Sequence, residues 1–290
     1  MQVFYSPAYV GAAHAFDTTR KAAWIVDSLH ESPIRGIQLR EPQSLTEADV
    51  LEVHDGAYVA AVRTGEPRAL AESQGFSWDP GLWPMVLASN GGAVAAARAA
   101  LTDGIAGSLS SGLHHARRSH GAGFCTFNGL VLAAHAALAA GARSVLILDL
   151  DAHCGGGTQS LISRHHAIRH SDVAVHAFDH YDGGDRLTLV DDAAAYLPAV
   201  AARLEALDAE PLPGLCLYNA GMDPHEGCPN GGLPGITSAI LAEREAMVFA
   251  WCRERGVPVA FVLAGGYVGM RLDVASLVAL HRLTLTAAAY

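Results

Sequence analysis

The sequence predicts an α/β fold in which a mostly parallel central sheet carries helices on both faces. Short apolar runs recur along the chain from about residue 121, and amphipathic helical segments separate them. Short runs that are apolar throughout are typical of strands buried in a parallel sheet. Their alternation with helices indicates a series of βαβ units.

Four apolar runs are the predicted buried strands, and one further strand is expected near the N-terminus. The runs cover residues 144–150, 172–178, 214–220 and 258–264, and the N-terminal strand covers residues 2–6. Helical patterns lie at 128–142, 191–210 and 237–256, and further helices are expected in the first hundred residues. No repeat or linker divides the chain, so we expect a single domain over residues 1–290.

The composition favours a folded protein that does not bind nucleic acid. Hydrophobic residues make up 51% of the 290 residues and charged residues 17%, which is sufficient for a sizeable core. The 19 basic and 29 acidic side chains give a net charge of −10. This balance argues against a general nucleic-acid surface and is compatible with a cationic substrate, such as a lysine side chain or a polyamine.

The cysteine content and the apolar segments predict a cytoplasmic protein without a membrane partner. Five scattered cysteines would leave one unpaired in any set of disulfides, which favours a reducing compartment. The N-terminus lacks the basic start and apolar run of a signal peptide. The stretch 129–142 is too short to span a bilayer. The oligomeric state cannot be predicted from these patterns.

Polar residues follow each of the four predicted buried strands. In open parallel sheets, ligands bind beyond the carboxyl ends of the strands. We therefore expect the side chains at these positions to converge on one crevice. They are Asp149, Asp151 and His153 after the first strand, Asp179 and His180 after the second, Asp223 after the third, and Gly265, Gly266 and Tyr267 after the fourth.

Three of these residues form a candidate metal site. Asp151 and His153 lie two residues apart, so both side chains can turn the same way where the chain is still extended. Asp223 would add a third ligand, which leaves an open position as catalytic sites require. An isolated Asp-x-His pair is also typical of a capping carboxylate and a surface histidine. The predicted convergence with other polar residues favours the metal interpretation.

The adjacent residues His114 and His115 are candidate proton carriers. They lie on a glycine-flanked loop, and histidine can serve as both base and acid near neutral pH. Asp149 could hold one of the two rings and fix its tautomer. Tyr267 follows two glycines and could donate a hydrogen bond to an oxyanion, although a tyrosine after a strand often serves packing alone.

Together these motifs resemble the histone deacetylase and acetylpolyamine amidohydrolase family. The motifs HHA, GFC-x-FN, DLDAH-x-x-G-x-T, NAG-x-D and GGY occur in that order, and the resemblance begins at YSP near the N-terminus. SSGLHH and DLDAH are closest to the class IV branch. The resemblance implies an arginase/deacetylase-like three-layer fold. It also implies a hydrolase that removes an acyl group from an acyl-lysine, an acylpolyamine or a related small amide.

The resemblance also implies roles for individual residues. Asp151, His153 and Asp223 would be zinc ligands, although iron(II) suits the same ligand types. Tyr267 would polarise the acyl carbonyl. The remaining implied roles are His115 as the main base and acid, His114 paired with Asp149, Gly123 and Phe124 in the wall of the acyl channel, and a potassium ion bound through the Asp149 segment.

Two positions depart from the family pattern. Cys154 stands where the family usually has a second His or Gln, and Gly156 stands where it usually has an Asp or Asn that orients the second active-site histidine. We therefore expect His115 to be less well oriented than in the family. These departures leave open a non-catalytic or weakly active binder of acylated amines.

A ureohydrolase with two manganese ions is a further alternative. Those enzymes need an Asp at the position of Gly155, and they need an Asp-x-Asp around Asp223, where this chain has His225 instead. The sequence therefore favours a site for one metal ion.

Overall fold

The sheet at the centre of the molecule runs parallel throughout, as the apolar runs predict. The structure is a computed structural model and describes residues 1–12 and 16–290. In this part of the chain, eight strands form one sheet in the order β2-β1-β3-β8-β7-β4-β5-β6. They are β1 (Gln2–Phe4), β2 (Gln38–Arg40), β3 (Ile105–Ser108), β4 (Val145–Asp149), β5 (Ile168–Ala174), β6 (Leu187–Leu189), β7 (Leu215–Ala220) and β8 (Val259–Leu263).

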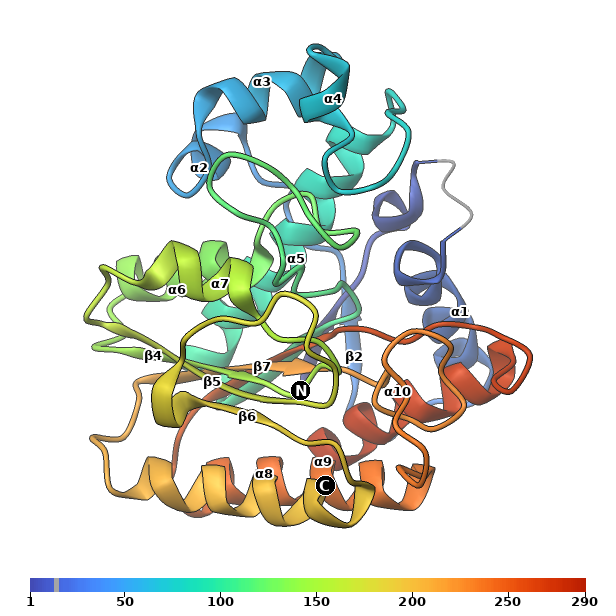
Figure 1. Cartoon of the computed structure of the whole chain (residues 1–290), viewed down its shortest axis with the longest axis vertical. Helices are drawn as coiled ribbons and strands as arrows, with labels where there is room; N and C mark the ends of the chain where they lie inside the picture. Colours follow the sequence, from blue (N-terminus) through green and yellow to red (C-terminus); the bar gives the residue numbers. More distant parts are fainter. Residues whose placement is uncertain (13–15) are drawn as a thin grey trace.

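Helices cover both faces of this sheet, which gives three layers (Figure 1). In Figure 1, α6 and α7 lie on one side of the strands and α8 and α9 on the other. The helices are α1 (Asp17–Glu31), α2 (Glu47–Leu51), α3 (Gly56–Thr64), α4 (Arg68–Ala71), α5 (Leu82–Asp103), α6 (Gly129–Ala139), α7 (Gly156–Ile162), α8 (Ala193–Asp208), α9 (Ser238–Glu254) and α10 (Val274–Ala289), with short 3₁₀ helices at Pro7–Val10 and Gly184–Arg186.

Two hydrophobic cores separate the layers, and β4 supplies side chains to both. Leu146 and Leu148 pack into the core that α8 and α9 cover. Val145 and Ile147 pack into the core formed with α5 and α6. Successive side chains of a strand point to opposite faces, so a strand between two helical layers must be apolar at every position. This requirement explains why the buried strands have continuous apolar runs.

Side-chain caps fix where several helices begin. Asn128 accepts a hydrogen bond from the backbone N–H of Val131 at the start of α6. Asp192, Thr237 and Asp273 cap α8, α9 and α10 in the same way. Such caps satisfy backbone N–H groups that have no partner within the helix. None of the helices in the described ranges is long and apolar enough to cross a bilayer.

The predicted position of β5 is wrong by four residues. The apolar pattern placed this strand at 172–178, whereas it covers Ile168–Ala174 and includes the polar residues at 169–171, of which His170 and Ser171 are buried. An apolar pattern does not include such residues in a strand. After Ala174 the chain leaves the ladder, and the N–H groups of the next two residues both donate to Ala152 O.

Three short strands, β2, β3 and β6, were not predicted, because segments of three or four residues carry little pattern. Strand β3 matters most for the site. It lies between β1 and β8, so β3, β8, β7, β4 and β5 are consecutive neighbours in the sheet. The loops that follow these five strands therefore meet at the same edge of the sheet.

Candidate active site

Asp151, His153 and Asp223 come together in space at the carboxyl edge of the sheet. One potential ligand atom from each lies within 4.8 Å of the others. His153 Nδ1 is 3.2 Å from Asp151 Oδ1 and 3.2 Å from Asp223 Oδ2. Both carboxylates are buried, and His153 is partly buried. In the described part of the chain, one such group of potential ligands occurs.

Backbone contacts hold this triad in place. The Ala152 N–H donates to Asp223 Oδ1 over 3.0 Å, and the Gly265 N–H donates to Asp151 Oδ2 over 2.8 Å. A Cβ atom on Gly265 would lie 2.6 Å from Asp151 Oδ2 and would also collide with Asp223 Oδ2. The glycine after β8 is therefore needed because the backbone passes directly against both carboxylates.

The donor set of the triad suits a divalent metal ion. Burial and the neighbouring Asp151 raise the pKa of Asp223 to about 6, since two carboxylates crowd a space away from water. Asp223 Oδ2 makes no well-formed hydrogen bond within the described residues. Two carboxylates and one imidazole supply three protein ligands, the number found in catalytic zinc sites, and both ligand types bind zinc. These residues therefore fit the metal that the sequence predicts.

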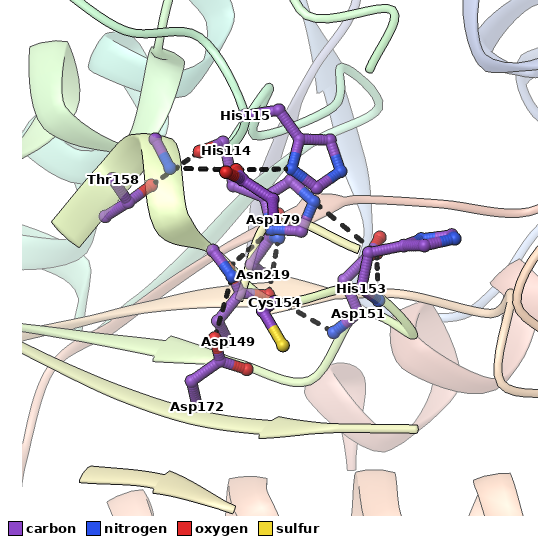
Figure 2. A network of polar contacts seen from close by, with 12 residues as sticks. His114, His115, Asp149, Asp151, His153, Cys154, Thr158, Asp172, Asp179 and Asn219 are labelled. Carbon is purple, nitrogen blue, oxygen red and sulfur yellow. Dashed lines mark hydrogen bonds and ion pairs between the residues drawn. The ribbon is translucent and has the colours of Figure 1, made fainter. Parts of the chain in front are cut away.

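The two adjacent histidines lie beside each other and beside Asp151 and His153 (Figure 2). Their ring centroids are 3.9 Å apart. His114 Nδ1 lies 2.8 Å from Asp149 Oδ2, which is the pairing that the sequence predicts. Burial opposes protonation of His114, but the negative charges of Asp149 and Asp151 outweigh this effect and raise the pKa of His114 to about 10.

His115 has a different carboxylate partner, Asp179. His115 Nδ1 lies 2.9 Å from Asp179 Oδ2, and Figure 2 shows the two side chains facing each other. Gly156 predicts a His115 that is less well oriented than in the family, but in the structure a carboxylate from another loop contacts its ring. Burial and the charge of His114 lower the pKa of His115 to about 4, so its ring is neutral near pH 7.

The loop that carries the histidines is tied to the helices around it. His54 Nδ1 lies 2.9 Å from Arg117 O, and the N–H of Asn128 donates to His54 Nε2 over 3.0 Å. The Asn128 side chain donates to the carbonyl oxygens of His114 and Ala116, both over 3.3 Å. The positions of the two histidines are therefore set by buried polar contacts.

A pocket of ≈ 620 Å³ opens above the triad. Phe124 and Phe178 both line it. The Phe178 ring packs edge-on against the His115 ring, with a distance of 4.9 Å between the ring centroids. Gly123 lies against the His115 ring, where a side chain would collide. The other lining residues are Ser73, Gln74, Gly75, His153, His176, Pro229, Asn230, Gly231, Gly232 and Tyr267.

Tyr267 lies between this pocket and a smaller cavity of ≈ 20 Å³ next to His114 and Asp151. It is 8% exposed, and its ring contacts Phe16 at a centroid distance of 5.5 Å. Burial, followed by the charges of Asp223 and Asp151, raises its pKa well above the ordinary value. The phenol therefore keeps its proton near pH 7 and can act as a hydrogen-bond donor.

All nine candidate site residues from the sequence thus lie around one pocket and the triad beneath it, and the structure adds others. Asp179, Phe178 and Asn219 were not among them. Asn219 Nδ2 donates to Asp149 Oδ1 over 2.8 Å. Asp179 was recognised as a polar residue after a strand, but nothing in its spacing indicated a partner 64 positions away. Cys154 is buried, with its Sγ 3.6 Å from His176 O.

Comparison with known proteins finds relatives of this chain by sequence. The model of the family described as the histone deacetylase domain matches residues 14–183. An uncharacterised protein of Picosynechococcus is 32% identical over 248 residues, covering 82% of each chain. Histone deacetylase 2 of Arabidopsis thaliana is 26% identical over 291 residues, which cover 92% of this chain and 75% of the relative.

Solved structures share the fold. The HD domain of HDA15 matches with a TM-score of 0.79 and 22% identity, covering 98% of this chain and 90% of that one. An acetylpolyamine aminohydrolase from Burkholderia pseudomallei also has a TM-score of 0.79, with 21% identity and coverage of 99% and 98%. These matches confirm the predicted three-layer deacetylase fold.

Proposed function

Because this chain belongs to the histone deacetylase family, we propose that it is a metal-dependent hydrolase that removes the acyl group from an acylated amine. The observation that carries the proposal is the triad of Asp151, His153 and Asp223, which lies beside two carboxylate-paired histidines at the base of a pocket. Zinc is the metal we propose, and iron(II) suits the same ligands. When bound there, the metal would supply Lewis-acid polarisation of the acyl carbonyl.

In the proposed reaction, His115 moves the protons. Its Nδ1–H donates to Asp179 Oδ2, so Nε2 is free to accept a proton from the attacking water. The same Nε2 then returns a proton to the departing amine. His114, charged and paired with Asp149, contributes positive charge beside the reacting carbonyl. The hydroxyl of Tyr267 donates to the developing oxyanion.

The aromatic walls of the pocket support an extended substrate. Phe124 and Phe178 offer apolar surface to an acyl-lysine, acylpolyamine or similar chain. We propose such an acylated amine as the partner, with neither nucleic acid nor a membrane involved. The resemblance to the class IV branch stays a prediction.

We propose one catalytic domain over residues 1–290, because strands from both ends of the chain belong to the same sheet. A cytoplasmic location is supported by five free, buried cysteines. A potassium ion beside Asp149 stays a prediction. The buried Asp172 Oδ1 on the next strand has no hydrogen bond within the described residues and could face such an ion.

An activity screen tests this function. Zinc-loaded protein is incubated with Nε-acyl-lysine peptides and acylpolyamines of increasing chain length, and released amine is measured. Asp223→Asn, with the same metal treatment, is the matched inactive control. We expect amine release by the wild type and none above background by the variant. Tight binding of the same compounds without release would instead establish a non-catalytic binder.

A further inference from the structure

A carboxylate from the loop after β5 lies under the proposed proton carrier. Asp179 Oδ2 accepts hydrogen bonds from His115 Nδ1 and from the backbone N–H of Gly157, both over 2.9 Å. Its other oxygen accepts from the guanidinium of Arg117. The Asp179 side chain is 6% exposed. Three donors thus fix a buried carboxylate with one oxygen directed at the imidazole.

The space that Asp179 occupies exists because residue 156 has no side chain. A Cβ atom on Gly156 would lie 2.6 Å from Asp179 Oδ1 and would collide with the Asp179 carbonyl oxygen. A side chain at 156 and the observed position of Asp179 therefore exclude each other. The carboxylate of Asp179, which comes from another loop, can therefore lie here only because residue 156 is glycine.

The backbone at Asp179 supports the same interpretation. Its φ of 59° lies in the left-handed region, which Asp adopts more readily than most residues other than glycine. Backbone conformations of this kind persist where the surrounding contacts hold them, often at functional sites. The contacts here are those of the carboxylate with His115, Gly157 and Arg117.

We propose that Asp179 is the positioning residue of His115 and holds the imidazole in the tautomer with a proton on Nδ1 and a free Nε2. This inference rests on the proposed function, because it concerns the group that moves protons in that reaction. Asp179 lies behind the ring and acts through His115. A carboxylate on the far nitrogen of a catalytic imidazole fixes both the orientation of the ring and its tautomer.

Two substitutions at one position separate positioning from structural support. Asp179→Ala removes the acceptor, whereas Asp179→Asn keeps one oxygen that can still accept from Nδ1–H. Asp182→Ala removes an exposed carboxylate three residues along the same loop and is the matched control. Zinc-loaded variants are assayed on the acyl-lysine peptide that the wild type hydrolyses fastest.

We expect Asp179→Ala to lower kcat about 10- to 100-fold with little change in KM, as for other partners that orient catalytic ligands. Asp179→Asn should recover part of this loss, and Asp182→Ala should match the wild type. Wild-type kcat in Asp179→Ala would overturn the proposal. The proposal would also be overturned if Asp179→Ala and Asp179→Asn lost kcat equally and lost folded protein equally.

A second readout does not depend on turnover. Histidine labelled with ¹⁵N reports the tautomer of His115 by NMR, and the signal is assigned by its absence in His115→Gln. The wild type should show a hydrogen-bonded proton on Nδ1, and Asp179→Ala should lose it. An unchanged signal in Asp179→Ala overturns the positioning role. A wild type that shows the signal but hydrolyses no acylated amine would refute the proposed function and leave the positioning of His115 supported.

Discussion

Replacing Tyr267 by Phe tests whether its hydroxyl acts in the reaction. The substitution keeps the ring, which contacts Phe16, and removes only the O–H group. Tyr267 lines both the substrate pocket and the small cavity beside Asp151. Because burial raises the pKa of Tyr267 well above its ordinary value, the hydroxyl is a donor throughout the neutral pH range.

The size of the effect follows from what the hydroxyl would contact. A donor aimed at the oxyanion is most valuable when the negative charge has developed, and losing one such donor lowers kcat about 10²- to 10³-fold, or about 2.7–4 kcal/mol. The neutral carbonyl of the bound substrate gains less from the same donor. We therefore expect KM of Tyr267→Phe to stay close to that of the wild type.

The assay is steady-state hydrolysis of an Nε-acyl-lysine peptide with bound metal quantified in each sample. Tyr5→Phe is the matched control, because Tyr5 packs against Tyr9 and does not line the pocket. Thermal unfolding of both variants should resemble that of the wild type. A Tyr267→Phe protein with full metal content and undiminished kcat would refute the role of the hydroxyl.

Three further predictions concern the metal, the pocket and the loop. Zinc at 100 times its Kd should stabilise the wild type by about 2.7 kcal/mol in thermal unfolding, and Asp223→Asn should lose this gain. Phe178→Ala should raise KM for acyl-lysine peptides about tenfold, or about 1.4 kcal/mol, without lowering thermal stability, because this side chain is 45% exposed. Burial lowers the pKa of His54 to about 4, below the value of 6.5 in the unfolded chain, so the unfolded state takes up a proton first as pH falls. The contribution of His54 to stability is therefore complete above pH 6.5 and decreases toward pH 4. Between pH 7.5 and 5, the free energy of unfolding of the wild type, measured in urea, should fall by about 2 kcal/mol more than that of His54→Gln.

The sequence predicted the fold where the pattern was strong. Continuous apolar runs identified β4, β7 and β8 to within one or two residues, because a strand covered by helices on both faces is apolar on both faces. The predicted β5 began four residues late because residues 169–171 are polar, although His170 and Ser171 are buried. Strand β3 was missed because four residues are too few to show a period.

The site was predictable as far as it follows from strand ends and adjacent residues. Asp151, His153 and Asp223 were identified because the carboxyl ends of parallel strands meet at one edge. The partnership of Asp179 with His115 was not predictable, because it depends on the missing side chain at 156 and on a left-handed residue in a loop. From the sequence, Gly156 predicted only that His115 would be less well oriented. The compensating carboxylate became visible only in three dimensions.

We propose that Asp151, His153 and Asp223 hold one metal ion in front of the two histidines. Crystals of the zinc-loaded protein, measured on both sides of the zinc absorption edge, test this claim most directly. We predict one anomalous peak per chain at this place, about 2.0–2.2 Å from ligand atoms of all three side chains. A map without a peak there, or with zinc bound only at other residues, would contradict the account.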